Sequence, residues 1–281
     1  MKNKFIVDSP SNLNDYALSH LKKHGEVLAI TSSYIGAHEK EKSSIPIING
    51  AANPITCIYK GKNQSIKNEG NDSLDKNEAF RFIIEKTREE KLDLISFGPL
   101  TNFALAIIND HTLSKRVNHI YIMGGGHAFG NASPSAENNI FTDPEAAKIV
   151  FESEIPISLV TLDCLYQVDI KNKYIQSLEY RKENADKSLQ FNDNTLSDDN
   201  YCRLKILHEL ITAMVATNSI NFTSEYHFVG IETKGKITRG KTVIDVTNVL
   251  NKKANAKVIC KIEELDLINE IKKTQNKEVL I

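Results

Sequence analysis

Polar side chains follow a glycine-rich stretch near the middle of the sequence. Three consecutive glycines at 124–126 precede Asn131, Glu137 and Asn139, and no helical or strand pattern separates those three residues. Amide and carboxylate groups can donate to and accept from several hydroxyl groups at once. The three side chains therefore predict a binding loop for a polyhydroxylated ligand. The glycines predict that the backbone approaches this ligand closely.

A second polar stretch, DSPSNLND, follows the first apolar segment of the chain. Its first and last residues, Asp8 and Asp15, place carboxylates as one half of an acidic metal site would. Pro10 and Asn14 stand where further carboxylates are expected. Because proline has neither a carboxylate nor a titratable proton, it can neither coordinate a cation nor take a proton from water. The alternative is that Asp8 and Asp15 cap backbone N–H groups.

The composition indicates an ordinary globular protein with a small-molecule partner. The 281 residues are 41% hydrophobic and 25% charged, which argues against disorder and predicts a single domain over residues 1–281. The 35 Lys+Arg nearly balance the 36 Asp+Glu, so we expect partners to include neither nucleic acid nor a membrane. The four cysteines lack metal-binding spacing and are expected as reduced thiols. With no apparent signal segment or membrane span, we expect a cytoplasmic protein.

Apolar runs of strand length alternate with segments of helical period. This alternation predicts an α/β fold, a mostly parallel sheet covered by helices on both faces. The predicted strands are 4–7, 27–31, 92–96, 120–123, 157–162, 243–246 and 257–262. The predicted helices are 13–23, 76–91, 100–109, 144–151, 201–218 and 263–273. The helix at 144–151 has the clearest start, because Asp143 can cap it and Pro144 suits its first position.

Ligands of an open parallel sheet bind at the carboxyl ends of its strands. The predicted strands place four loops on that edge, at 8–15, 97–102, 124–139 and 163–167. Their convergence predicts a pocket. A polar stretch at 180–200 is expected to be a solvated loop, or alternatively a flap near the ligand.

Five motifs, in the same order and over nearly the whole chain, resemble the inosine-uridine-preferring nucleoside hydrolases. They are SFGPLTNFALAI, IMGGGHAFGN, SAENNIFTDPEAAKIVFES, the LHE that ends at Glu209, and KGKITRGKTVIDV. The resemblance implies a nucleoside hydrolase-like α/β domain that binds calcium and splits the N-glycosidic bond of purine or pyrimidine ribonucleosides. It also implies a homo-oligomer, a dimer or a tetramer. We expect the last motif to be structural support between a strand and the C-terminal helix, with a direct ligand role for Arg239 as the alternative.

The resemblance assigns roles residue by residue. Metal ligands would be Asp8, Asp15, the backbone carbonyl of Phe97, and Glu209, which replaces a family aspartate. His208 would be catalytic, protonating the leaving base. The sugar would be bound by Asn14, Asn131, Glu137 and Asn139.

The opening motif departs from the family pattern, which is roughly DxDxGxDD. The second aspartate, which holds calcium and acts as general base, is Pro10 here, and the third, which grips the ribose, is Asn14. Asn12 replaces the motif's glycine, and Gly36 stands near the position of a family asparagine. We expect calcium binding to be weak or absent, because calcium affinity depends on the number of charged ligands. Asp8, Asp15 and Glu209 could still hold a cation through waters.

Two functions remain open. The first is a nucleoside N-ribohydrolase-like enzyme whose activity is impaired by Pro10 and Asn14. The second is a non-catalytic protein of the same fold that binds a nucleoside or ribose, or serves as a partner subunit. Bound calcium would favour the first.

Overall fold

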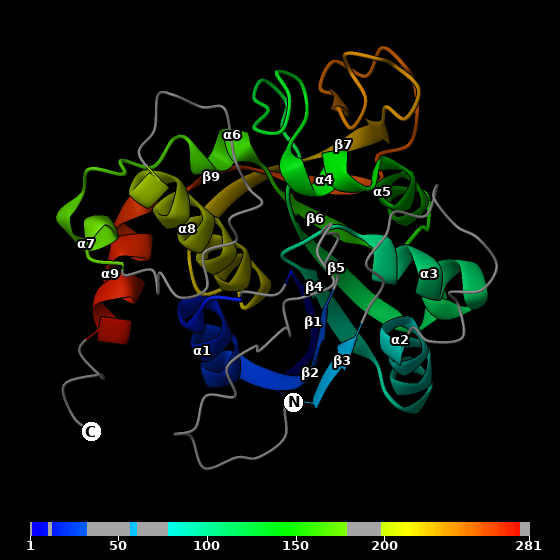
Figure 1. The fold of residues 1–281 in the computed structure, drawn as a ribbon, viewed down its shortest axis with the longest axis horizontal. Coiled ribbons are helices and arrows are strands. Elements are labelled where there is room, and N and C mark those ends of the chain that lie inside the picture. Colours follow the sequence, from blue (N-terminus) through cyan, green and yellow to red (C-terminus); the bar gives the residue numbers. More distant parts are fainter. Residues whose placement is uncertain (1, 11–12, 33–56, 61–77, 179–197, 276–281) are drawn as a thin grey trace.

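The computed structural model describes residues 2–10, 13–32, 57–60, 78–178 and 198–275. Within these ranges nine strands form one sheet in the order β3-β2-β1-β4-β5-β6-β9-β7-β8 (Figure 1). The strands are β1 (Asn3–Ser9), β2 (Gly25–Ser32), β3 (Cys57–Lys60), β4 (Leu92–Ser96), β5 (Val117–Met123), β6 (Ile157–Val160), β7 (Phe222–Ile231), β8 (Thr242–Asp245) and β9 (Ala256–Ile262). The helices are α1 (Asp15–His24), α2 (Glu78–Glu89), α3 (Thr101–Asn109), the 3₁₀ turn Leu113–Lys115, α4 (Asn138–Thr142), α5 (Pro144–Phe151), α6 (Leu162–Leu165), α7 (Lys173–Gln176), α8 (Asp198–Ala216) and α9 (Glu264–Gln275).

The sheet is mostly parallel, as the sequence predicts. β1 pairs in parallel with both β2 and β4, and the parallel pairing continues through β5 and β6 to β9. β7 runs antiparallel to β9 and to β8. The sequence pattern missed β3 and β7. Most positions of β7 are at least partly exposed. An apolar run marks only strands that are well buried.

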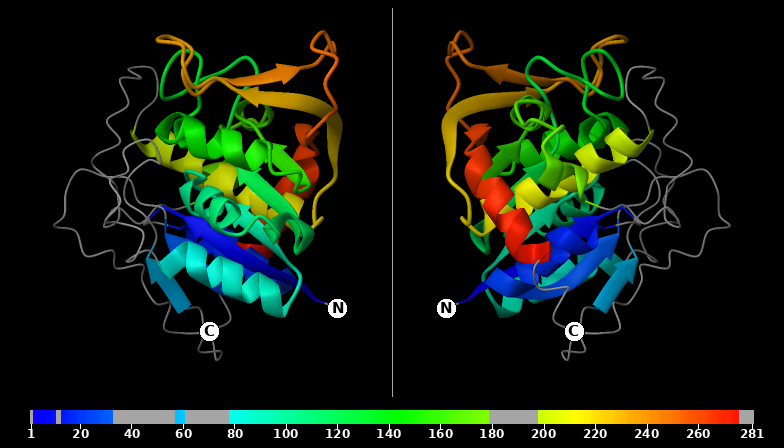
Figure 2. Two further views of the ribbon diagram at one scale, coloured as in Figure 1. Left: turned by 90° about the vertical axis from the view of Figure 1, so that its right-hand side faces the viewer. Right: turned by 90° about the vertical axis from the view of Figure 1, so that its left-hand side faces the viewer.

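Helices cover both faces of the sheet. Along β1, Ile6 packs on the cluster that includes α2, α3 and α5, whereas Phe5 and Val7 pack on the cluster that includes α1. Because neighbouring side chains of a strand point to opposite faces, β1 is buried on both sides. Figure 2 shows the two layers in turn, with α2, α3 and α5 in front on the left and α1 and α9 in front on the right. This arrangement confirms the predicted fold class.

Helix α5 begins where the sequence predicts. The Asp143 carboxylate accepts a hydrogen bond from the Ala146 backbone N–H at 3.1 Å and another from the Thr101 hydroxyl at 2.7 Å. Pro144 takes the first helical position, where its missing N–H removes no intrahelical bond. Asp143 therefore fixes the start of α5 and joins it to the start of α3.

One strand boundary changes, the expectation of reduced thiols is confirmed for three of the four cysteines, and some predicted positions lie outside the described ranges. β6 ends at Val160, because Thr161 caps helix α6, so the predicted strand 157–162 is too long. Cys164, Cys202 and Cys260 are free thiols. Asn12, Gly36 and residues 180–197 of the polar stretch lie outside the described residues. Among the helices that are described, none has the length and apolar character that crossing a membrane requires.

We predict that Asp143→Ala lowers the free energy of unfolding by about 1–2 kcal/mol, because a helix cap is lost and Thr101 loses its partner. Urea unfolding followed by circular dichroism measures the change. Asp169→Ala is the control, since the Asp169 carboxylate accepts a backbone N–H from Lys171 at 3.0 Å in an exposed turn. Equal, small losses in the two variants would contradict the assigned role.

Candidate functional site

The strand order has a switch point between β1 and β4. From β1 the chain continues outward to β2 and β3 on one side, whereas β4, β5 and β6 follow one another on the other side. At such a point the connections leave in opposite directions, and a crevice opens at the carboxyl ends of the strands. Asp8 lies opposite Ser96 there, and the Phe97 backbone N–H donates to the Asp8 carbonyl at 2.8 Å. The structure thus places Asp8 and Phe97 side by side at the expected edge.

The Asp8 side chain is held by two neighbouring elements. It is 1% exposed, and its Oδ1 accepts hydrogen bonds from the Thr31 hydroxyl of β2 and from Asn102 Nδ2 of α3, the latter at 2.8 Å. Thr31 and Asn102 were not among the predicted site residues. Asn102 could have been found, since it ends the GPLTN segment of a recognised motif, whereas Thr31 carries no signal beyond its place at the end of a strand.

Asn14 joins α1 to α8. Its Oδ1 accepts the Ala17 backbone N–H at 3.0 Å and so caps α1. Its Nδ2 donates to Glu209 Oε2 at 2.9 Å and to the Ile206 carbonyl at 3.2 Å, and its backbone N–H also donates to Glu209 Oε2, at 3.2 Å. Nδ2 of Asn14 faces two acceptors, Glu209 Oε2 and the Ile206 carbonyl, and Oδ1 faces a donor, the Ala17 N–H. These partners fix the orientation of the side-chain amide. Asn14, rather than Asp15, is therefore the cap of α1.

Glu209 is a buried acid at the centre of this contact. It is 1% exposed, and burial raises the pKa of its carboxyl to about 7, although Lys205 and the hydrogen bonds from Asn14 act in the opposite direction. Lys205 Nζ lies 3.9 Å from Oε1, and no described residue donates a hydrogen bond to Oε1. Glu209 thus changes charge near neutral pH.

His208 precedes Glu209 on α8 and points into the protein. It is 4% exposed, and its Nε2 lies 2.8 Å from the Val160 carbonyl of β6. Since a carbonyl only accepts, Nε2 carries the proton. Burial lowers the pKa of His208 to about 4, so the ring is neutral at pH 7 and on the order of one molecule in a thousand is protonated. Its role as the acid for a leaving base stays a prediction.

Glu137 organises the loop after β5. It is 4% exposed and caps helix α4: its Oε2 accepts the backbone N–H groups of Gly125 and Asn139 at 3.0 Å and of Ile140 at 3.2 Å. Burial raises the pKa of Glu137 to about 7 despite these bonds. This carboxylate therefore holds the glycine stretch against the start of α4.

Asn139 lies on α4, which corrects the expectation of an irregular loop through this residue. Its Nδ2 donates to the Met123 carbonyl at 3.0 Å and to the Phe97 carbonyl at 3.3 Å, and so links the ends of β5 and β4. Asn131 remains in the loop, where its Oδ1 accepts the Asn138 backbone N–H at 2.8 Å. Sugar binding by these residues stays a prediction.

The glycines are required by side chains of the chain itself. Gly124 has a φ of +149°, and a Cβ there would lie 2.7 Å from Glu137 Oε2. Gly125 has a φ of +69°, and a Cβ there would lie 2.8 Å from the Thr242 methyl group. Close packing within the protein thus accounts for these two glycines, which the sequence analysis explained by close approach to a ligand.

Residues far along the chain anchor the same loop. The two Asp163 oxygens accept the backbone N–H groups of His127 at 2.6 Å and Ala128 at 2.8 Å. The Thr242 hydroxyl accepts from the Gly126 N–H at 2.8 Å and donates to the Gly126 carbonyl at 2.7 Å. Asp163 and Thr242 were not among the predicted site residues, although Thr242 lies within the KGKITRGKTVIDV motif.

Arg239 supports the fold at α5. Its guanidinium makes two hydrogen bonds of 2.7 Å with the Glu145 carboxylate and a further bond of 2.6 Å with the Thr233 carbonyl. The expected support is therefore directed to α5 and not to the C-terminal helix, because Glu145 in the first turn of α5 provides a matching planar carboxylate.

The described residues do not fit the calcium site that the resemblance implies. Calcium takes six to eight oxygen ligands. Asn14 instead donates an N–H group to Glu209, whereas a cation bound between these two residues would need an oxygen from each. The side-chain oxygen of Asn14 caps α1. Pro10 has no side-chain oxygen that could coordinate a cation. The Phe97 carbonyl accepts a hydrogen bond from Asn139 Nδ2. Asp15, the first residue of α1, is the carboxylate of this group that remains partly exposed.

We predict that Glu209→Gln changes the pH dependence of stability. A folded-state pKa of about 7, above the ordinary 4.5, means that wild-type stability falls as pH rises from 4.5 through 7. The variant lacks this loss and should be more stable than the wild type at pH 8 by about 1–3 kcal/mol, and equal to it below pH 4.5. Urea unfolding across this pH range measures the difference. Glu152→Gln, at an exposed position after α5, should show no comparable gain, and a destabilised Glu209→Gln protein at pH 8 would contradict the assignment.

Comparisons with known proteins agree with the fold and the motifs. A family model described as inosine-uridine preferring nucleoside hydrolase matches residues 20–269. A pyrimidine-specific ribonucleoside hydrolase RihA of Shewanella sp. strain ANA-3 is 34% identical over 198 residues, which is 68% of this chain and 62% of the relative's length. The RihA of Salmonella enteritidis PT4 is 30% identical over 278 residues, covering 87% of this chain and 89% of the relative.

Solved structures share the architecture. A plant nucleoside hydrolase, the PpNRh1 enzyme, superposes with a TM-score of 0.70 at 20% identity, covering 97% of this chain and 98% of the plant protein. A purine-preferring ribonucleoside hydrolase from Gardnerella vaginalis gives 0.69 at 21% identity, covering 96% of each chain. At these identities the likeness concerns the fold. Together with the family match over most of its length, it shows that the chain belongs to the inosine-uridine preferring nucleoside hydrolase family.

Proposed function

We propose that this protein is a nucleoside N-ribohydrolase-like protein that binds a ribonucleoside or ribose at the β1–β4 edge and hydrolyses the N-glycosidic bond slowly. Family membership and relatives named pyrimidine-specific ribonucleoside hydrolases support the substrate class, with uridine and cytidine as the first probes. A single domain over residues 1–281, a homo-oligomer and a cytoplasmic location complete the proposal, from the family resemblance and the composition.

The contact between Asn14 and Glu209 carries the argument for slow hydrolysis. Hydrolysis of the glycosidic bond needs a base that takes a proton from water, and a bound cation strengthens that water as a nucleophile. Here Pro10 offers no base, and the amide of Asn14 satisfies Glu209 Oε2 with an N–H group. The Asp8 carboxylate, the nearest alternative base, accepts hydrogen bonds from Thr31 and Asn102. These two hydrogen bonds direct Asp8 Oδ1 toward β2 and α3.

A non-catalytic role is the second candidate, and the position of His208 favours it. A general acid must reach the leaving base with its proton, yet the Nε2 proton of His208 is directed to the Val160 carbonyl of β6. A protein with neither base nor acid in reach would still bind a nucleoside or ribose, or act as a partner subunit. Binding without turnover would identify this role.

We predict that uridine, cytidine and inosine are hydrolysed at least about a thousandfold more slowly than the enzyme median of about 10 s⁻¹, because the general base is missing and the cation site is weakened. Release of free base, followed by liquid chromatography, measures the rate. Asp8→Asn is the control for the remaining base, since a rate unchanged by this variant does not depend on Asp8. A turnover number near the median, lost in Asp8→Asn, would show that Asp8 has replaced the missing base.

We predict that Pro10→Asp combined with Asn14→Asp creates calcium-dependent stability. The new carboxylate at position 14 would stand in the place of the Nδ2 group that now lies 2.9 Å from Glu209 Oε2, so the metal-free variant should be destabilised above pH 7 by like-charge repulsion. Calcium should relieve this repulsion and restore part of the hydrolysis. The single variants should gain little, because ligands of one site act together.

Calorimetry and thermal unfolding with and without calcium measure the gain. Asn172→Asp is the matched control, because Asn172 also caps a helix, accepting the Tyr174 N–H at 3.0 Å, but that helix is α7, away from the candidate site. A folded double variant that binds no calcium would show that the edge has been rebuilt beyond its first loop, and the non-catalytic role would become the better account.

A further inference from the structure

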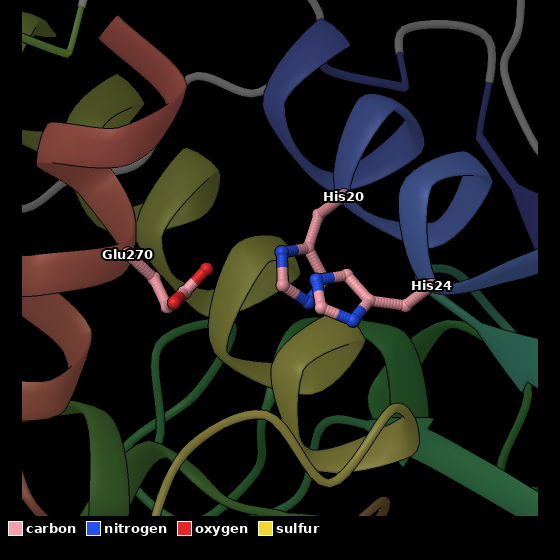
Figure 3. Close-up of side chains that lie close together, drawn as sticks. All are labelled: His20, His24 and Glu270. Atoms are coloured by element: carbon pink, nitrogen blue, oxygen red, sulfur yellow. The ribbon is translucent and has the colours of Figure 1, made fainter. Parts of the chain in front are cut away.

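We propose that His20, His24 and Glu270 bind a late divalent transition metal, with Zn²⁺ as the representative ion, and that this metal joins α1 to α9. One ring nitrogen of each histidine and one carboxylate oxygen of Glu270 all lie within 4.8 Å of one another. Figure 3 shows the two imidazoles of α1 side by side, facing the carboxylate of α9. The proposal does not depend on the proposed hydrolase function.

The spacing of the two histidines places them on one face of α1. Residues four apart in a helix are neighbours on its surface, and the rings are stacked with centroids 4.4 Å apart. Ligand atoms around a tetrahedral zinc lie about 3.3 Å apart, given zinc–nitrogen distances of about 2.0–2.1 Å. Since no two of the ligand atoms are more than 4.8 Å apart, side-chain rotations that shorten the separations by at most about 1.5 Å, and that turn the stacked rings so that both nitrogens face one ion, would bring them into this range.

The tautomer of His20 is set by two hydroxyl groups after α8. His20 Nε2 lies 2.9 Å from Thr217 Oγ1 and 2.9 Å from Ser219 Oγ. Both hydroxyls donate to backbone carbonyls, Thr217 to Ala213 at 3.0 Å and Ser219 to Met214 at 3.3 Å. The two hydroxyl oxygens also lie 3.0 Å from each other. Donation to the backbone carbonyls leaves both hydroxyls as acceptors toward Nε2, which favours a proton on Nε2 and a lone pair on Nδ1, the nitrogen on the Glu270 side in Figure 3. Outer partners of this kind orient histidine ligands in metal sites.

His24 presents a buried nitrogen without a partner. Its Nε2 is inaccessible to solvent and makes no hydrogen bond with the described residues. In Figure 3 this nitrogen, the one farther from the helix, points toward His20 and Glu270. A buried polar atom left unsatisfied costs free energy, and coordination of a metal would remove that cost.

The charges around the cluster favour a divalent metal of the zinc class. Burial lowers the pKa of His20 to about 4 and also lowers the pKa of His24, so both rings are neutral ligands at pH 7. Glu270 is ionised, because Lys273 and Lys23 lower its pKa against the effect of burial. Two imidazoles and one carboxylate are the ligands of Zn²⁺, Co²⁺ and Ni²⁺, whereas calcium requires oxygen.

Two lysines compete with the metal for Glu270. Lys273 donates to Oε1, and Lys23 Nζ lies 3.8 Å from Oε2. Both lysine side chains are substantially exposed, so either can move into solvent when a metal binds. The contact of Lys23 with Oε2 is the weaker of the two, so its loss on metal binding would cost less free energy than loss of the Lys273 hydrogen bond.

The site lies at the far end of α1 from the candidate functional site. Asn14 caps the start of α1 and His24 ends it, which separates the two by about 15 Å of helix. β2 begins at the next residue, Gly25. The metal would therefore hold the end of α1, the start of β2 and the C-terminal helix together, and its effect would be on stability and not on the hydrolytic step.

Titration of chelator-treated full-length protein tests the proposal. We expect one Zn²⁺ per chain by calorimetry, a visible ligand-field spectrum typical of four-coordinate Co²⁺, and a higher melting temperature with either metal. His24→Asn and Glu270→Gln should each weaken zinc affinity at least about tenfold, and Thr217→Val, which removes an outer partner, by about 10- to 100-fold. Circular dichroism of the metal-free variants confirms that they are folded.

Two controls separate this site from others. His227→Asn removes a histidine from the exposed pair with Glu225, whose atoms lie 2.9 Å apart, and should leave zinc affinity unchanged. Glu209→Gln should also leave it unchanged, since Glu209 belongs to the candidate functional site. Absence of stoichiometric zinc binding overturns the proposal, as does affinity that survives both His24→Asn and Glu270→Gln or that is lost in Glu209→Gln.

Discussion

Burial of the Glu209 carboxylate between α1 and α8 determines how the rest of the candidate site is built. A carboxylate removed from water must be hydrogen-bonded, paired or protonated. Here Asn14 provides two N–H groups to one oxygen, while its own oxygen caps α1. The same amide therefore satisfies Glu209, begins a helix and fixes that helix against α8. This contact lies among the residues to which the family resemblance assigns a cation, and it holds the start of α1 against α8 through hydrogen bonds within the protein.

The electrostatics of the edge follow from the same burial. Glu137 and Glu209 both have pKa values raised to about 7, and the pKa of His208 is lowered to about 4. All three shifts have desolvation as their largest cause, and all three favour the neutral form. These three buried groups thus carry less charge near pH 7 than they would in water. In a site that holds a divalent cation, the carboxylates would instead be kept ionised by the metal.

The sequence predicts the parts of this protein that depend on burial and local capping. β4 and α5 have the predicted bounds, because a buried apolar run and an Asp-Pro helix start are signals contained in a few neighbouring residues. The family motifs point to Asp8, Asn14 and Glu209, and the structure brings the last two into contact. What the sequence could not predict is the direction of each side chain. That Asn14 donates to Glu209 while it caps α1 depends on the relative position of two helices far apart in the chain, as does the proximity of His20 and Glu270.

The glycine-rich stretch has a consequence for the charge of any ligand at this edge. Five successive backbone N–H groups, at 124–128, already donate within the protein, to the Val160 carbonyl and to the side chains of Glu137, Thr242 and Asp163. A phosphate-binding loop works in the opposite way, since it leaves consecutive N–H groups unpaired and directed at the anion. A phosphorylated ligand would here meet two carboxylates where it needs donors. The loop at 124–128 therefore offers no unpaired backbone N–H group to a phosphate, and it differs in this respect from the anion-binding loops of nucleotide sites.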